Sequence, residues 1–180
     1  MPDVQAGSGA GTGIFAQHSG PGTTTINVTN NTVRQINGSQ AIWMLLGDDP
    51  GGGGSGTMNV TVTGNNIAEE GATPSARTGI IIQSGRVSND TDLMCADVGG
   101  AGALANSITN FNNRIRPNQR FNTVMRMRGY TGASNDNAAV NTYLTGRNPG
   151  TVNVTSTSVA GGGGIFNTTP AGSACPQPTL

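Results

Sequence analysis

The chain has 180 residues, 29 of them glycine, and only 10% of its residues are charged, with nine basic and nine acidic side chains that cancel. All nine basic residues are arginine, and without a net positive charge a general nucleic-acid binder is excluded. Frequent β-branched residues and low net charge exclude a disordered chain. No apolar run approaches the ~20 residues of a membrane span, so we expect no membrane insertion. We expect one domain over residues 1–180, with an irregular lead-in at 1–12.

Two kinds of strand alternate along the chain. Short apolar segments occur at residues 13–16, 41–44, 79–82 and 164–167. Segments that alternate β-branched residues with Thr or Asn occur at residues 25–33, 60–67 and 152–159. This period of two is typical of a strand with one buried face. Each Thr/Asn segment turns through a polar corner to a single aliphatic residue, namely Val33, Ile67 or Val159.

Aligning the repeats predicts which residues lie side by side. Two columns form in the Thr/Asn strands and one in the apolar strands: Val28, Val62 and Val154; Ile26, Val60 and Val152; and Ile14, Ile42, Ile80 and Ile165. Asn31 and Asn65 coincide at the corner, and the segment beginning at Asn106 matches it. Strand pairs that recur every ~30–40 residues predict a parallel β-solenoid.

The last third of the chain has a less regular pattern. Arginine and methionine alternate over residues 120–130, which we expect to be the apolar strand of a fourth coil. Apolar residues at helical spacing predict a short helix over residues 135–146, with Asn135 or Asp136 as N-cap and Gly146 near its end. A proline-containing tail follows over residues 168–180.

The two cysteines, Cys95 and Cys175, are far apart and have no neighbouring Cys or His at metal-binding spacing. We therefore favour one long-range disulfide between them over a zinc site. A disulfide indicates an extracellular or cell-surface location. Because no secretion signal begins the sequence, we expect that signal to lie outside it.

The Asn-Asn corner at residues 30–31 and 65–66, each following an alternating strand, resembles right-handed parallel β-helix proteins of the pectin-lyase-like type. Residues 94–178 resemble the C-terminal part of large secreted bacterial β-strand-repeat proteins, which are read as adhesin-like. The segments that carry this second resemblance are 95–100, 114–122, 129–132, 139–144 and Cys175. The resemblance implies an all-β, right-handed parallel β-helix of about four coils, with one short helix near the C-terminal end.

Carboxylates are the first candidates for chemistry, because polysaccharide cleavage needs two of them about 5–9 Å apart. The available acids are Asp48, Asp49, Glu69, Glu70, Asp90, Asp92 and Asp97. Most fall in glycine-rich or polar segments, so we interpret them as solvated loop charges and expect no catalytic residue. Residues 89–92 place oxygen ligands at alternate positions but lack a calcium-binding loop, so we also expect no metal and no cofactor.

The arginines are the second candidates. Five of the nine lie between residues 114 and 128, with no acid from 98 to 135: Arg114, Arg116, Arg120, Arg126 and Arg128. Forked guanidinium groups suit the carboxylate or sulfate groups of acidic glycans. The alternative is that they pair with Asp90, Asp92 and Asp97 on neighbouring coils.

An outward aromatic stripe is the third candidate. If the isoleucines of the apolar strands point inward, Phe15, Trp43, Ile81 and Phe166 point outward. Trp43 could then stack on a sugar ring, unless the helix or a loop covers the stripe.

These features favour a non-enzymatic structural or adhesion module of an extracellular or cell-surface bacterial protein, with an acidic polysaccharide or another surface protein as partner. One alternative is a β-helix protein that binds or cleaves polysaccharides. Another is the subunit of an extracellular filament, since the open ends of a solenoid invite end-to-end self-association.

Overall fold

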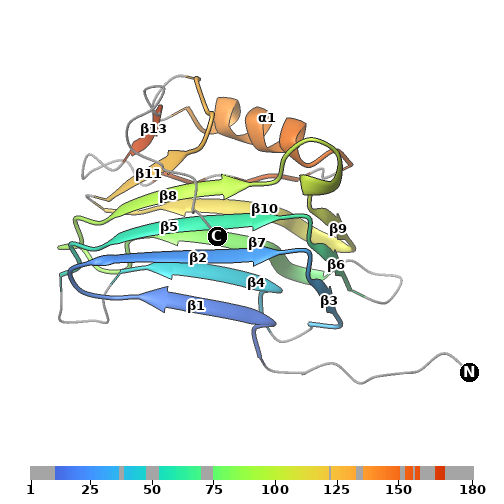
Figure 1. Ribbon diagram of the computed structural model, residues 1–180, viewed down its shortest axis with the longest axis horizontal. Helices are drawn as coiled ribbons and strands as arrows, with labels where there is room; N and C mark the ends of the chain where they lie inside the picture. Colours follow the sequence, from blue (N-terminus) through green and yellow to red (C-terminus); the bar gives the residue numbers. More distant parts are fainter. Residues whose placement is uncertain are drawn as a thin grey trace, which may run out of the picture.

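The computed structural model describes residues 11–36, 39–47, 53–69, 75–121, 123–132, 136–150, 153–155, 157–158 and 165–168. These residues form mostly β-strands in three parallel sheets, together with one α-helix, α1 (Asn137–Arg147), and a short 3-10 turn, η1 (Gly102–Leu104) (Figure 1).

Sheet A has the order β1 (Ile14–His18), β4 (Ile42–Leu46), β7 (Ser75–Ser84), β10 (Phe111–Gln119), β12 (Thr157–Ser158). Sheet B has the order β2 (Thr23–Thr29), β5 (Thr57–Thr63), β8 (Leu93–Val98), β11 (Val124–Met127), β13 (Ile165–Thr168). Sheet C contains β3 (Thr32–Arg34), β6 (Asn66–Ala68) and β9 (Ser107–Thr109). Along the chain, the first nine strands belong to sheets A, B and C in turn, and this order occurs three times.

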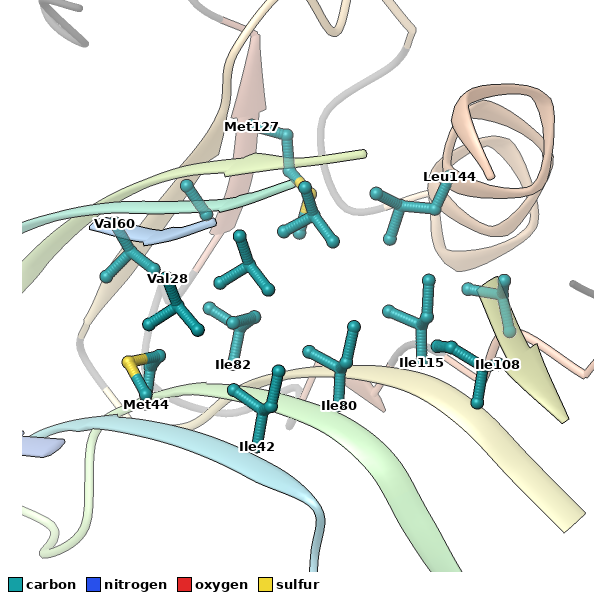
Figure 2. Packing of buried hydrophobic residues seen from close by; sticks show 14 of the residues in the cluster. Val28, Ile42, Met44, Val60, Ile80, Ile82, Ile108, Ile115, Met127 and Leu144 are labelled. Atoms are coloured by element: carbon teal, nitrogen blue, oxygen red, sulfur yellow. The ribbon is translucent and has the colours of Figure 1, made fainter. Parts of the chain in front are cut away.

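The core lies between the sheets because strands of all three sheets direct apolar side chains inward. Sheet A contributes Ile42 and Ile80, sheet B contributes Val60, and sheet C contributes Ile108 (Figure 2). Leu144 of α1 points into the same cluster and is fully buried (Figure 2). Burying one aliphatic side chain of this size contributes roughly 1.5–3 kcal/mol to stability.

The predicted columns are confirmed for the first two thirds of the chain. Ile14, Ile42 and Ile80 are register partners in sheet A, and Val28 pairs with Val62 in sheet B. Ile26 likewise pairs with Val60. In β2 and β5 the inward Ile26, Val28, Val60 and Val62 alternate with Thr or Asn, so a slip of one residue would turn these apolar side chains out to solvent.

The predicted register is wrong in the last third. The isoleucine column continues to Ile115 of β10, whereas Ile165 pairs with Val124 in sheet B. Residues 124–127, expected in an apolar strand of sheet A, form β11 of sheet B. Val154, aligned with Val28 and Val62 in the sequence, bridges Ile115 of sheet A instead. Strand alternation alone does not say which sheet a strand joins.

A ladder of asparagine side chains runs along the corner between sheets B and C. The Nδ2 of Asn31 donates to Oδ1 of Asn65 at 3.0 Å, Asn65 donates to Asn106 at 2.9 Å, and Asn106 donates to Asn148 at 3.0 Å. Each acceptor Oδ1 also receives the backbone N–H of the preceding asparagine. The predicted coincidence of Asn31, Asn65 and Asn106 at the corner is confirmed.

The helix closes one end of the core. Asp136, one of the two N-cap residues expected from the sequence, accepts a hydrogen bond from Ala139 N at 3.0 Å. Val140 and Leu144 are buried. Asn148, the C-cap residue, is the last rung of the asparagine ladder, so the end of α1 is fixed at the corner.

Candidate binding site on the outer face of sheet A

Two aromatic rings stack on the outer face of sheet A. Ile14 and Ile42 point into the core, so the next residues, Phe15 and Trp43, lie on the opposite face. These two residues are register partners in β1 and β4. Their ring centroids are 5.2 Å apart and their planes are inclined at 52°. Phe15 is 50% exposed, so the pair offers an apolar surface to solvent.

The aromatic pair forms one wall of an open hollow of about 510 Å³. Its described lining comes from β1, β4 and β7 and from the segments that follow β7 and β10: Phe15, Gln17, Trp43, Leu45, Gln83, Arg86 and Arg120. The lining therefore combines an apolar wall with amide and guanidinium groups, and it contains no carboxylate. A site of this kind binds a ligand that has an apolar face and anionic or hydroxyl groups.

The amide groups of the lining are fixed by the turns that follow the strands. Gln17 Nε2 donates to Gly47 O at 3.1 Å, and Gln83 Nε2 donates to Gly85 O at 3.0 Å. These hydrogen bonds hold both side chains at the same edge of the hollow.

A buried aspartate positions the turn that carries Arg86. Asp90 is fully buried, and its Oδ2 accepts the backbone N–H groups of Arg86 at 2.6 Å and Val87 at 2.8 Å. Its Oδ1 accepts the N–H of Gly54 at 2.7 Å. Asp90 thus joins the turn after β7 to the chain entering β5.

Arg120 lies directly after β10, on the other side of this turn. Its guanidinium carbon is 5.0 Å from the ring centroid of Phe121, a cation–π contact that restricts the side chain. Arg86 and Arg120 place two guanidinium groups at one hollow. Sequence reasoning missed Arg86 because it lies in a polar turn. Its place in the sequence could have indicated a role in the site, since Arg86 is three residues past Gln83, at the end of an apolar strand.

The predicted arginine cluster is divided between two sheets. Arg114 and Arg116 are on β10 of sheet A, and Arg126 is on β11 of sheet B. Arg116 continues the row of Phe15, Trp43 and Ile81, as the register partner of Ile81. Of the five predicted arginines, Arg120 alone is among the described residues that line the hollow.

Two of the other arginines have structural contacts. Arg114 donates to Gly150 O at 2.8 Å. Arg128 Nε is 3.1 Å from Asp97 Oδ2, and Arg147 of α1 pairs with the other oxygen of the same carboxylate. Pairing of an arginine with an acid on a neighbouring coil, the alternative expected from the sequence, is therefore confirmed for Arg128 and Asp97.

The Asp97 cluster attaches the helix to the sheets. Tyr143 of α1 donates its hydroxyl hydrogen to Arg128 O, and Arg147 Nε donates to Val98 O at 3.2 Å. Burial raises the pKa of the Tyr143 hydroxyl, and the nearby Arg147 partly opposes this shift. These contacts hold α1 over the end of the core.

The expectation that the acids are solvated loop charges is wrong for Asp97, which is buried on β8, and also for Asp90 and Asp92. Both are buried, and Asp92 Oδ1 accepts the N–H of Gly56 at 2.9 Å. Burial is possible because glycines at the facing positions leave room: a Cβ on Gly54 would be 2.6 Å from Asp92 Oδ1. Both carboxylates hold backbone segments in place by accepting hydrogen bonds from backbone N–H groups.

Other predicted features lie outside the described residues. Asp48, Asp49, Glu70, the side chain of Phe166 and Cys175 belong to this group. Cys95 is buried on β8, and its disulfide with Cys175 stays a prediction. In the described ranges, no group of three or more His, Cys, Asp or Glu side chains could hold a metal ion. No helix found there combines the length and apolar character needed to cross a membrane.

Comparisons with protein-family models, with curated proteins and with solved structures found no match for this chain.

Proposed function

We propose that the chain is a non-enzymatic module that binds an acidic polysaccharide on the outer face of sheet A. The observation that carries the proposal is the hollow in which the exposed Phe15–Trp43 pair faces Arg86 and Arg120. The apolar face of a sugar ring packs on the aromatic rings, while a guanidinium fork binds a carboxylate or sulfate group. The amides of Gln17 and Gln83 lie within reach of sugar hydroxyls.

A binding role is favoured over cleavage by the absence of a carboxylate from the described lining. Glycosidic bond hydrolysis needs an acid and a second carboxylate around the bond. Among the acids in the described ranges, Asp90 lies nearest in sequence to a lining residue, four residues after Arg86, and it uses both oxygens to accept backbone hydrogen bonds. It is held as a structural element of the Arg86 turn.

The fold we propose is a right-handed parallel β-helix of about four coils. It is supported by the parallel pairing of every described strand and by the repeated order of sheets A, B and C. The location we propose is extracellular or on a bacterial cell surface, where the module serves adhesion or structure. The predicted disulfide supports this location, and the intact mass should show no thiol that can be alkylated before reduction.

Calorimetric titration with an acidic and a neutral polysaccharide tests the binding role. We expect the acidic polymer to bind and the affinity to fall as salt is added. Two variants, Phe15→Ala and the double change Arg86→Ala with Arg120→Ala, should each weaken binding about tenfold. Arg77 is an exposed arginine of β7 outside the hollow, so Arg77→Ala is the matched control and should change affinity less than about twofold.

Two results would contradict the proposal. One is equal affinity for the neutral and acidic polymers. The other is a loss on Arg77→Ala as large as the loss on the double arginine change. Release of oligosaccharides during the titration would replace the binding role with polysaccharide cleavage.

A further inference from the structure

The two ends of the stacked sheets are covered to different extents. Towards the C-terminal end, Ile115 and Met125 are fully buried, and Val140 and Leu144 of α1 are buried in the same core cluster. At the N-terminal end, Ile14, Ala16 and Ile26 point inward but are only partly buried, whereas their partners Ile42 and Val60 are buried. The core is therefore open to solvent at the N-terminal end.

The strands at this end have a neighbour on one side only. Among the described strands, β1, β2 and β3 are the first of their sheets (Figure 1). Natural proteins protect such edges with charged side chains, proline or bulges. No Lys, Arg, Asp, Glu or Pro occurs in β1 or β2, and β2 pairs with β5 in unbroken register. β1 and β2 therefore lack those protections, and the charged residue of this edge is the exposed Arg34 at the end of β3.

The outward-facing residues of β2 are symmetric in polarity about its centre, since Thr23, Thr25, Asn27 and Thr29 are all polar and exposed. Ile26 is the middle residue of Thr23–Thr29, with exposed Thr25 and Asn27 on either side. A twofold axis through Ile26 would pair β2 antiparallel with a second β2. Each Thr25 would then face Asn27 of the other copy on the outer face, and the two Ile26 side chains would meet on the core side.

We propose that this edge binds a second copy of the chain and forms a closed dimer through antiparallel β2 strands. With β1 and β2 free of charged groups, the contact brings no like charges together. The partly buried Ile14, Ala16 and Ile26 lose their remaining exposure to water, which supplies a hydrophobic contribution. A twofold contact uses the N-terminal edge of both copies, so it closes at two copies and does not continue into a filament.

Two double variants at the same positions test this pairing. Thr25→Lys with Asn27→Lys places like charges opposite each other at both symmetric pairs, whereas Thr25→Lys with Asn27→Glu places opposite charges there. Both residues are exposed on β2, so the folded monomer tolerates either pair of changes. We expect the dimer dissociation constants of the two variants to differ by at least about fivefold, with the Lys/Glu variant binding more tightly.

Sedimentation equilibrium from micromolar to millimolar protein measures these constants, and thermal melting verifies that both variants are folded. Wild-type protein should convert from monomer to dimer with increasing concentration. A wild-type monomer throughout this range would overturn the proposal, and so would assemblies that grow beyond two copies. Equal dimer constants for the two variants would overturn the proposed register.

Discussion

Replacing Asn106 with alanine perturbs the asparagine ladder at a fully buried rung. The Asn106 side chain is fully buried and lies between Asn65 and Asn148. Its Oδ1 accepts two hydrogen bonds from Asn65, one from the backbone N–H at 3.1 Å and one from Nδ2. Its Nδ2 donates to Val62 O at 2.9 Å and to Asn148 Oδ1. Alanine removes all four.

The cost depends on which groups lose their last partner. Val62 O still accepts from Gly99 N, and Asn65 Nδ2 still donates to Val28 O. The backbone N–H of Asn65 is buried and loses Asn106 Oδ1, the acceptor it has in the described structure. An orphaned buried donor costs about 1–3 kcal/mol, and each other lost hydrogen bond about 0.5–1.5 kcal/mol. We expect a total loss of roughly 3 kcal/mol in the free energy of unfolding.

Urea unfolding followed by circular dichroism measures this loss. Asn31→Ala is the matched control, because Asn31 is a partly exposed rung at the open end of the same ladder. Its removal should cost about 1 kcal/mol. If the two substitutions cost the same, or Asn106→Ala costs less than about 1 kcal/mol, the amides do not hold the corner together.

Three further predictions concern the attachment of the helix and the corner beside it. Asp97→Asn removes the carboxylate that pairs with two arginines, and it should lower the unfolding free energy by about 2 kcal/mol in urea titrations. Gly99→Ala should destabilise the protein by at least about 2 kcal/mol more than Gly102→Ala. Both glycines have positive φ, but an added Cβ overlaps Asn148 only at Gly99. Equal melting temperatures of the two variants would contradict this prediction. Burial raises the pKa of Tyr143, so the folded state retains the proton longer and stability should be constant below about pH 10 and fall above it. The fall should be shallower in Tyr143→Phe, measured as thermal melting against pH.

The strands in the first two thirds of the chain were predicted from the sequence, because their residue pattern specifies the buried face without ambiguity. β2 and β5 alternate Thr or Asn with β-branched residues, and the asparagine corner follows both strands at the same distance. A register shifted by one residue would expose valine and bury threonine. The helix was also accessible, since Asp136 precedes apolar residues at helical spacing.

The last third of the chain was not predictable in the same way. β10 has a single isoleucine, Ile115, between two arginines, and β11 alternates methionine with arginine. Such patterns fit either sheet, because the period of two specifies a buried face but not the neighbouring strand. Only part of the candidate site was predicted from the sequence, namely Trp43 and Arg120. Arg86 was not predicted, because its position depends on contacts of Asp90 with backbone groups distant in sequence.

The fluorescence of Trp43 tests the central claim most directly, because it is the only tryptophan in the chain and it lines the hollow. We predict that an acidic polysaccharide changes its emission saturably, that added salt reverses the change, and that Arg86→Ala with Arg120→Ala abolishes it. Emission that stays constant while calorimetry records binding of the same polymer would place the ligand elsewhere and contradict the assignment of sheet A as the binding face.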